Sequence, residues 1–377
     1  MIHTSAPPRL SRRLMLSGLV GVAATPALPV HARQAAPTRD ALLDAAFAAA
    51  APPALIGGVV TREGLVWSGV RGVRRSGGTE AATLDDRWHL GSNTKAMTAA
   101  LYGRLVDKGQ AKWGATVAEM FPELTIDPAW AATPVESFLN HTAGLRDVDM
   151  LGSTWLLTAR ADTASLTSQR AVLAERALSK PPGGAVGTFA YANANYILVG
   201  AAIERITGLS WEDAMAAEVF QPLGLNSCGS GPPVGDQPWG HSGLGGQATP
   251  MDPTNLFSDN PLAMGPAGTA HMSLADYATF VRAVLTEGGG WLKPETVTHL
   301  ITPPVPTGRS YALGWITVAG QPWARGTVIA HEGTNTMWHS MVVADPAGGR
   351  AFIALSNDEV RGAPACQQLV SSLIRMG

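Results

Sequence analysis

Strand-like patterns are confined to the two ends of the chain. Near the N-terminus, two apolar and β-branched runs, "ALIGGVVTREG" and "LVWSGVRGV", are separated by a short polar turn at Arg62–Gly64, which is typical of a β-hairpin. Four more such runs follow near the C-terminus: "YALGWITVAG", "GTVIAHEG", "MWHSMVVADP" and "RAFIALSND". The last two are joined by "PAGG", a sequence typical of a hairpin turn. We therefore expect strands at both ends of the chain.

Helical patterns fill the region between these strands. From Ala115 to about Gly290, Ala-rich amphipathic runs alternate with loops rich in Pro and Gly, as expected of helices and their connections. The clearest runs are "SQRAVLAERALSK", "YILVGAAIERITG", "WEDAMAAEV" and "LADYATFVRAVLTEG". Two further helices are predicted outside this region, one in "TRDALLDAAFAAA" with Thr38 as its N-cap and one from about Val360 to Arg375.

This order of elements predicts an α+β fold. Strands at both ends with helices between them imply one antiparallel sheet built from both termini and flanked by helices, with a mainly helical second lobe. We expect a single domain over residues 33–377, with a sheet lobe of about 38–92 and 300–377 and a helical lobe of about 93–299. A cleft between the lobes is the natural place for a ligand.

The first 32 residues have a different pattern. The pair Arg12–Arg13 is followed by a short, mildly apolar stretch and then by Val30-His31-Ala32, which is typical of a twin-arginine signal peptide with a small-residue cleavage site. The apolar stretch is too short and too rich in Gly and Pro to span a bilayer, and no later segment has the composition of a membrane span. We therefore expect the mature chain to begin near Arg33 and to be periplasmic or secreted.

Composition narrows the range of partners. With 46% hydrophobic and 15% charged residues the chain has the balance of a globular protein, and its net charge of −2 with no later Lys/Arg cluster argues against nucleic acid. Its two cysteines, Cys228 and Cys366, are too few for a disulfide framework or a zinc site. One bridge and two separate thiols both stay open. Without a metal or nucleotide motif, we expect no cofactor and no metal.

The stretch "WHLGSNTKAMTAALYGRLVDKG" contains the first candidate for chemistry. Positions three apart are neighbours on a helix, so Lys95 can hold its amine against the Ser92 hydroxyl. A serine becomes a good nucleophile only when a base takes its proton, and a lysine can do so when burial lowers its pKa. Taken alone, the pair is also compatible with a Ser N-cap followed by a solvated lysine.

Two further motifs carry polar groups that suit acyl transfer. Tyr191 and Asn193 precede a predicted helix in "FAYANANYILVG", where a phenol can shuttle a proton and an amide can hold a carbonyl. A loop tyrosine with an asparagine cap is the alternative. In "VIAHEGTN", His331 ends a strand pattern and Gly333 follows. Glycine there lets a ligand approach the backbone, and the Thr334 N–H can donate to an oxyanion.

The order S-x-x-K, Y-x-N and basic residue-x-Gly resembles the penicillin-recognising serine hydrolases, in the branch of class C-type β-lactamases, D-Ala-D-Ala carboxypeptidases, D-aminopeptidases and related esterases. Further phrases are similar to that family in sequence order: "HLGSNTKAMTAAL", "FLNHTAGL", "PPGGAVGTFAYANANYILVGAAIERITG", "FQPLGL" and "GPAGTAHMSLADYATFVRAVL". The likeness covers most of the mature chain and implies a beta-lactamase/transpeptidase-like fold.

The resemblance also implies a role for each matching residue. The implied catalytic residues are Ser92, whose hydroxyl forms an acyl-enzyme, and Lys95 and Tyr191, which share the proton transfers. The implied substrate-binding residues are Asn193, His331, Gly333 and Thr334. The N–H groups of Ser92 and Thr334 would form the oxyanion hole. The implied substrate is a small molecule or peptide, namely a β-lactam, an ester or a D-amino-acid amide.

The sequence departs from the family pattern in two places. The third motif is His-Glu-Gly instead of Lys-Thr-Gly, and a histidine with a pKa near 6.5 is neutral or half-charged near neutral pH, so it should hold a carboxylate less firmly. Met337 and Trp338 stand where relatives often have Gly-Phe, so we expect a bulkier pocket rim, with Trp323 and Trp338 as candidate pocket walls. His141 in "NHTAGL" is interpreted as a residue that fixes a loop.

Two alternatives concern the class of protein. An α/β-hydrolase needs G-x-S-x-G on a strand-to-helix turn, and the nearest match, residues 240–244, fails at its last position and lacks a preceding strand. A penicillin-binding or other non-turnover binding protein on the same fold stays open, because deacylation depends on where water sits. The presence of Ser92, Lys95, Tyr191 and Asn193 together argues against an inert scaffold.

Overall fold

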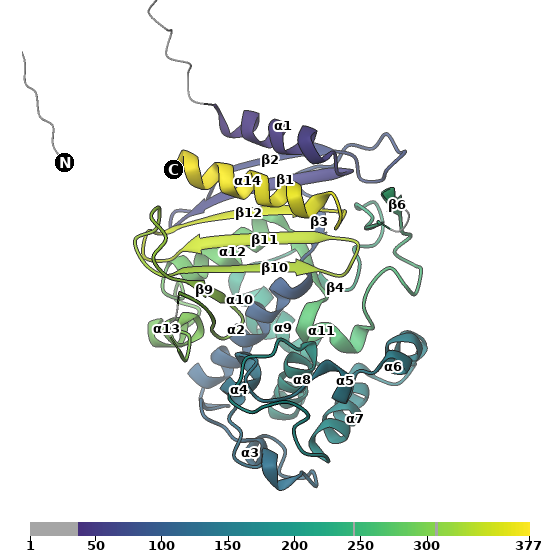
Figure 1. Cartoon of the computed structure of the whole chain (residues 1–377), viewed down its shortest axis with the longest axis vertical. Coiled ribbons are helices and arrows are strands. Elements are labelled where there is room, and N and C mark those ends of the chain that lie inside the picture. Colours follow the sequence, from purple (N-terminus) through teal and green to yellow (C-terminus); the bar gives the residue numbers. More distant parts are fainter. Residues whose placement is uncertain (1–36, 244–245, 306–307) are drawn as a thin grey trace, which may run out of the picture. The chain divides into compact units, whose positions relative to one another are not determined.

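The computed structural model describes residues 37–243, 246–305 and 308–377. The predicted signal peptide, residues 1–32, lies outside this part of the chain. Within the described residues, the main sheet has seven strands in the order β2-β1-β12-β11-β10-β9-β8 (Figure 1), and all neighbours are antiparallel. The strands are β1 (Ala54–Thr61), β2 (Leu65–Gly72), β8 (Arg309–Tyr311), β9 (Ile316–Val318), β10 (Val328–Thr334), β11 (His339–Asp345) and β12 (Arg350–Ser356).

The sheet joins the two ends of the chain, because β1 pairs with β12 along its length. Both faces of β1 are buried, and its two adjacent glycines show why. A Cβ on Gly57 would lie 2.6 Å from Leu369 on one face, and a Cβ on Gly58 would lie 3.2 Å from Leu274 on the other. Glycine therefore lets a helix pack closely on each side. The predicted sheet built from both termini is confirmed.

Helices α1 (Arg39–Ala50) and α14 (Gly362–Met376) pack side by side on one face of the sheet. The hydroxyl of Thr38 accepts from the N–H of Ala41 at 3.2 Å, so the predicted N-cap is confirmed. Apolar residues of both helices, including Leu43 and Leu369, form one core with β1 and β12. This layer lies on the opposite side of the sheet from the predicted catalytic serine.

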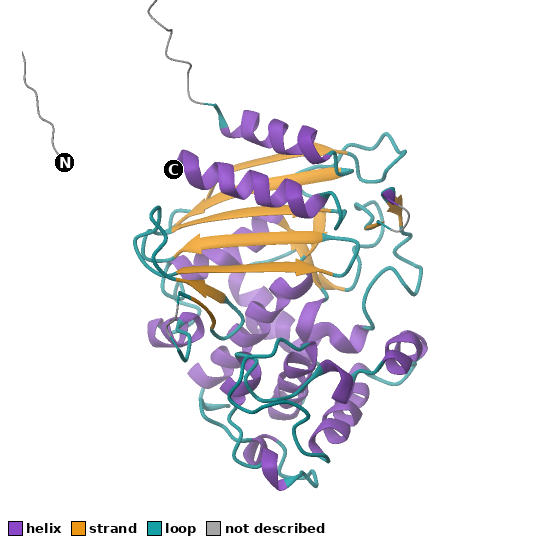
Figure 2. Ribbon diagram, in the orientation of Figure 1, coloured by secondary structure: helices purple, strands orange, loops and turns teal. Residues whose placement is uncertain are grey.

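The other face of the sheet meets the helical part of the chain, which Figure 2 shows as a separate group of purple ribbons. Helix α2 (Thr94–Asp107) crosses its centre and is buried on almost every side, which its small residues permit. The remaining helices are α3 (Val117–Met120), α4 (Val135–Leu139), α5 (Asp147–Met150), α6 (Ser153–Thr158), α7 (Leu166–Leu178), α8 (Asn193–Thr207), α9 (Trp211–Met215), α10 (Gln221–Leu223), α11 (Gly265–Gly268), α12 (Leu274–Leu285) and α13 (Pro294–Ile301). The predicted helical second lobe is thus present; its exact boundaries remain a prediction.

The expectation that strands return only near the C-terminus is wrong. Short strands also occur between the helices: β3 (Arg87–His89), β4 (Gly229–Ser230), β5 (His241–Ser242), β6 (Thr249–Pro250) and β7 (Ala270–Ser273). Strands β3, β7 and β4 pair into a small sheet. Strands of two to four residues are too short to show a pattern of alternating apolar and polar positions. They form because they pair with segments far away in the sequence, which local patterns do not reveal.

Two smaller expectations are also corrected or resolved. The run "YALGWITVAG" is not one strand, because β8 and β9 form a tight hairpin with Gly314 at a φ of +85°, a conformation that glycine adopts readily. Cys228 and Cys366 are separate free thiols. No helix in the described ranges has the length and apolarity needed to cross a membrane.

Candidate active site

The chain before α2 brings Ser92 against Lys95. Residues Gly91–Asn93 form a single 3-10 turn that leads into α2, so Ser92 lies at the start of the helix and Lys95 one turn later. The Nζ atom of Lys95 is 3.0 Å from the Ser92 Oγ. The predicted neighbour relation between the two side chains is therefore present in the structure.

Lys95 is fully buried and has two further partners. Its Nζ donates to the Asn193 Oδ1 at 2.9 Å and to the carbonyl of Ala267 at 2.6 Å. Burial lowers the pKa of Lys95 to about 7, and the charge of Asp147 acts in the opposite direction. A neutral amine has two hydrogens and one lone pair. Since the two carbonyl oxygens can only accept, the lone pair faces the Ser92 hydroxyl.

The Tyr191 hydroxyl lies on the other side of Ser92. Its oxygen is 2.9 Å from the Ser92 Oγ. The side chain as a whole is half-exposed. Its phenol nevertheless loses solvation to the surrounding protein, and this desolvation raises the pKa of the phenol above the ordinary value. Tyr191 is therefore protonated near neutral pH and donates to Ser92, whereas Lys95 is the group able to accept from it.

His141 holds the turn that carries Tyr191. Its backbone has a φ of 62°, and its Nδ1 accepts from the N–H of Ala192 at 3.3 Å and lies 3.0 Å from the Asn195 Nδ2. The imidazole also packs on the Tyr191 ring, with 4.4 Å between centroids. These contacts fit the loop-fixing interpretation of this histidine.

Asn193 is the first residue of α8 and touches an aspartate that the motifs do not include. Its Nδ2 donates to the Asp147 Oδ2 at 3.2 Å, and the N–H of Ala194 donates to the Asp147 Oδ1 at 2.9 Å. Sequence reasoning missed Asp147. The available signal was its position two residues after the "HTAGL" phrase, which does not reveal a contact with α8.

His331 lies on β10 and is neutral in this structure. Its Nδ1 is 2.7 Å from the backbone carbonyl of Glu332, which can only accept, so the ring proton is on Nδ1 and Nε2 accepts from the Tyr311 hydroxyl at 2.8 Å. Burial, with the nearby charge of Lys95, lowers the pKa of His331 to about 3. The pKa is thus shifted down from the ordinary value near 6.5, because the ring is almost fully buried and the imidazolium would be poorly solvated.

Backbone segments meet closely behind Ser92. A Cβ on Gly333 would lie 2.7 Å from the Ser92 nitrogen and would overlap the carbonyl of Leu90, and a Cβ on Gly91 would overlap the Thr334 nitrogen. Only glycine fits at both crossing points. The amides of Ser92 and Thr334, predicted to form the oxyanion hole, thus lie on adjoining segments.

A buried polar network holds these two segments, and sequence reasoning missed it. The Nδ1 of His89 accepts from the N–H of Gly91 at 3.1 Å, so its Nε2 carries the proton and meets the Asp259 Oδ2 at 2.9 Å. The Asn335 Nδ2 donates to the Asp259 Oδ1 at 2.8 Å. Asp259 thereby links the residue before Ser92 to the residue after Thr334.

A cavity of about 720 Å³ lies beside the serine. Tyr191 and His331 line it, together with further apolar or aromatic side chains: Phe189, Val305, Tyr311 and Ile316. Among its described lining residues the charged ones are Arg309 and Glu332. Pockets that are mostly apolar with a few polar groups suit small-molecule ligands.

The expected tryptophan walls are wrong. Met337 and Trp338 are buried, and Trp338 packs edge-on against Trp88 with 6.1 Å between ring centroids. Trp323 packs against Phe352 in the core under α14. Neither tryptophan lines the cavity beside Tyr191 and His331.

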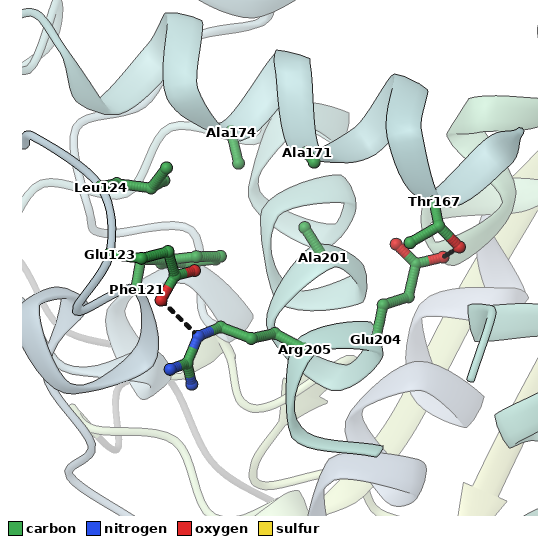
Figure 3. A pocket seen from close by; sticks show the side chains of 9 residues that line it. All are labelled: Phe121, Glu123, Leu124, Thr167, Ala171, Ala174, Ala201, Glu204 and Arg205. Carbon is green, nitrogen blue, oxygen red and sulfur yellow. Dashed lines mark hydrogen bonds and ion pairs between the residues drawn. The ribbon is translucent and has the colours of Figure 1, made fainter. Parts of the chain in front are cut away.

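Figure 3 shows a second, smaller hollow of about 200 Å³ between α7, α8 and the chain near Phe121. Alanines form much of its wall, and the ion pair between Arg205 and Glu123, at 2.7 Å, lies at one side. The Thr167 hydroxyl there is bonded to Glu204. None of the predicted site residues lines this hollow, so the cavity beside Ser92 is the candidate site.

Comparisons with known proteins show the family and the fold to which this chain is similar. A protein-family model described as "Beta-lactamase" matches residues 40–371. The chain is 30% identical over 220 residues to penicillin-binding protein 4 of Amycolatopsis lactamdurans, which covers 58% of this chain and 55% of that protein. It is 26% identical over 316 residues to an unguisins hydrolase of Aspergillus campestris, covering 78% and 56%. The chain thus spans about half the length of these curated relatives.

Two solved structures show the same fold. The octameric penicillin-binding protein homologue from Pyrococcus abyssi matches with a TM-score of 0.73 and 20% identity, over 90% of this chain and 76% of that one. A D-stereospecific amidohydrolase from Streptomyces sp. matches with a TM-score of 0.68 and 24% identity, over 89% and 98%.

Proposed function

The chain belongs to the beta-lactamase family and has its fold, and we propose that it hydrolyses amide or ester bonds through a Ser92 acyl-enzyme. One observation carries the proposal: the Ser92 Oγ lies 3.0 Å from a buried lysine amine and 2.9 Å from a protonated tyrosine. Relatives named as hydrolases support hydrolytic chemistry.

Acylation begins with Lys95 as the base. Its free amine accepts the Ser92 proton while the Oγ attacks the substrate carbonyl carbon. The N–H groups of Ser92 and Thr334 stabilise the oxyanion of the tetrahedral intermediate. Tyr191 protonates the leaving nitrogen or oxygen as its bond to carbon breaks, and the Lys95 ammonium returns a proton to the phenolate.

Deacylation repeats these transfers with water. Lys95 takes a proton from the water as the water oxygen attacks the ester carbon. The bond between that carbon and the Ser92 oxygen then breaks, and the Lys95 ammonium returns the proton to the Ser92 oxygen. The products are a carboxylic acid and the regenerated serine. A non-turnover binding protein, the alternative, would stop at the acyl-enzyme.

The neutral His331 supports neutral substrates. A permanently charged lysine at this position would attract a carboxylate, whereas an uncharged imidazole offers only hydrogen bonding. We propose that neutral esters and amides react at least as well at pH 7.5 as anionic β-lactams.

We also propose twin-arginine export, with residues 1–32 removed and the remainder periplasmic or secreted; replacing Arg12 and Arg13 by lysine would then retain the chain in the cytoplasm.

The test is a Ser92→Ala variant assayed with nitrocefin, p-nitrophenyl esters and D-amino-acid amides. It should lose all hydrolysis and all labelling by a fluorescent penicillin or phosphonate, with an unchanged circular dichroism spectrum. Ser242→Ala is the matched control, because Ser242 is the serine of the nearest alternative motif, and it should keep wild-type rates. Hydrolysis by Ser92→Ala, or an acyl adduct on Ser242, would contradict the assignment. A label that persists on wild type would indicate the binding protein.

A further inference from the structure

Asp147 is a charged side chain at the active site that has no part in the proposed proton transfers. It begins the short helix α5 and reaches the start of α8, where it accepts from the Asn193 Nδ2 at 3.2 Å and from the N–H of Ala194 at 2.9 Å. The adjacent Arg146 is paired with Asp149 at 2.7 Å. The charge of Asp147 is therefore directed at α8.

The carboxylate determines which way the Asn193 amide faces. A carboxylate only accepts hydrogen bonds, so the amide NH₂ must face Asp147. The amide oxygen then faces the Lys95 Nζ, at 2.9 Å. The reversed amide would direct its N–H groups toward the lysine, where donors already converge.

This orientation has a consequence for the base. The Asn193 oxygen and the Ala267 carbonyl, at 2.9 and 2.6 Å, take both hydrogens of a neutral Lys95 amine. Its lone pair is then directed at the Ser92 hydroxyl, 3.0 Å away. We propose that Asp147 is a positioning residue that, through Asn193, holds Lys95 as the base for Ser92 and sets the pH at which it becomes competent. This inference rests on the proposed function.

The surroundings of Lys95 make Asp147 the dominant charge. The ring centroids of Tyr191 and Tyr196 lie 4.9 and 5.7 Å from its Nζ, and helix α11 contributes the Ala267 carbonyl. The titratable side chains that face Lys95 from neighbouring elements are uncharged near neutral pH: Tyr191, Tyr196, His141 and His331. Burial lowers the pKa of Lys95, and Asp147 partly opposes that effect. Loss of the Asp147 charge should therefore lower this pKa further.

A purely structural role for Asp147 makes a different prediction. The N-cap residue of α8, Ala192, has no side chain able to cap the helix, and Asp147 supplies that acceptor from a distance. Loss of a cap alone would lower the melting temperature and the rate, but it would not move the pKa of Lys95. The pKa is thus the discriminating measurement.

The experiment measures this pKa directly by NMR of protein labelled with [ε-¹³C]lysine. The chain has five lysines, and a Lys95→Met variant identifies the Lys95 resonance. In Asp147→Asn, which keeps an oxygen for the Ala194 N–H, the pKa should fall by on the order of one unit, and the acid limb of kcat/KM should move with it. Asp149→Asn, in the same helix but paired with Arg146, is the control and should leave the pKa unchanged.

A reversed pair adds a second test of sign. Asp147→Asn combined with Asn193→Asp moves the carboxylate next to Lys95, so the pKa should rise above the wild-type value. An unchanged Lys95 pKa in both variants, with only reduced stability, would overturn the proposal and leave Asp147 as a helix cap. Because the resonance does not depend on turnover, absence of Ser92-dependent hydrolysis would disprove the proposed function without deciding this point.

Discussion

His331 and Lys95 show how burial determines protonation at single residues. Both side chains can carry a positive charge, and both are buried in the same region of the protein. Burial lowers the pKa of Lys95 to about 7 and that of His331 to about 3, since a low-dielectric surrounding disfavours the charged form. One residue becomes a base that is useful near neutral pH, and the other becomes a neutral hydrogen-bonding group.

Replacing His331 by lysine should change the preference for substrate charge. A lysine at this position can extend toward the open cavity and attract a substrate carboxylate. We expect the ratio of kcat/KM for an anionic substrate to kcat/KM for its methyl ester to rise roughly fivefold, which corresponds to about 1 kcal/mol. The effect is this small because a charge pair at a solvated cleft is screened. The measurement is steady-state kinetics at pH 7.5 on the matched pair.

A strong wild-type preference for the free carboxylate, with a ratio that His331→Lys leaves unchanged, would mean that the carboxylate is bound elsewhere. The wild-type rate provides a second check. It should rise with pH through the pKa of Lys95, about 7, because only the neutral amine accepts the Ser92 proton. His331 should add no limb near pH 6.5.

At the scale of elements, the site depends on how the turn before α2 meets the end of β10. Glycines at positions 91 and 333 allow the two backbones to touch, and the His89–Asp259–Asn335 network ties the same segments together from behind. Asp259 is only 5% exposed, so water cannot replace it as an acceptor.

Asp259→Ala should therefore cost about 1–3 kcal/mol of stability, because the Nε2–H of His89 and the amide of Asn335 lose their buried acceptor. Turnover should fall as well, since both backbone segments lose a restraint. Urea denaturation and kcat measure the two effects.

The matched control is Glu359→Ala, which removes another carboxylate paired with a histidine, His339, at 3.0 Å. Its carboxylate is 30% exposed, so solvent screens the pair and the loss should be smaller. Equal losses in the two variants would show that the Asp259 network has no special part in holding the site.

At the scale of the whole molecule, the active site lowers the stability of the fold. The unfolded chain binds a proton at Lys95 with an ordinary pKa of 10.5, whereas the folded chain does so only near 7. Stability should therefore fall as pH decreases from about 10.5 to 7, and this contribution is constant below 7.

Lys95→Met isolates this effect. The difference in unfolding free energy between wild type and Lys95→Met should change by up to about 4 kcal/mol between pH 7 and 10, with wild type gaining relative stability as pH rises. The constant cost of the two oxygens left without a donor shifts this difference equally at every pH, so it drops out of the change with pH. Parallel stability curves would mean that Lys95 keeps an ordinary pKa in the fold.

Features that depend on neighbours along the chain could be predicted from the amino-acid sequence. The hairpin signals, the amphipathic runs and the Thr38 cap predicted the sheet of both termini and the main helices, because alternation, helical periodicity and turn residues act locally. The spacing of Ser92 and Lys95 likewise predicts contact on one helix. The order of the three motifs identified the family, and the export signal remains a prediction.

The surroundings of those motifs depend on contacts that form only in the folded chain. Asp147 and Asn193 are 46 residues apart, and His89 and Asp259 are 170 apart, so no local pattern connects them. The neutral state of His331 and the inward packing of Trp338 depend in the same way on burial, which is the sum of contacts from many segments. Charge, tautomer and pKa follow from that sum, because the cost of a charge depends on every group around it.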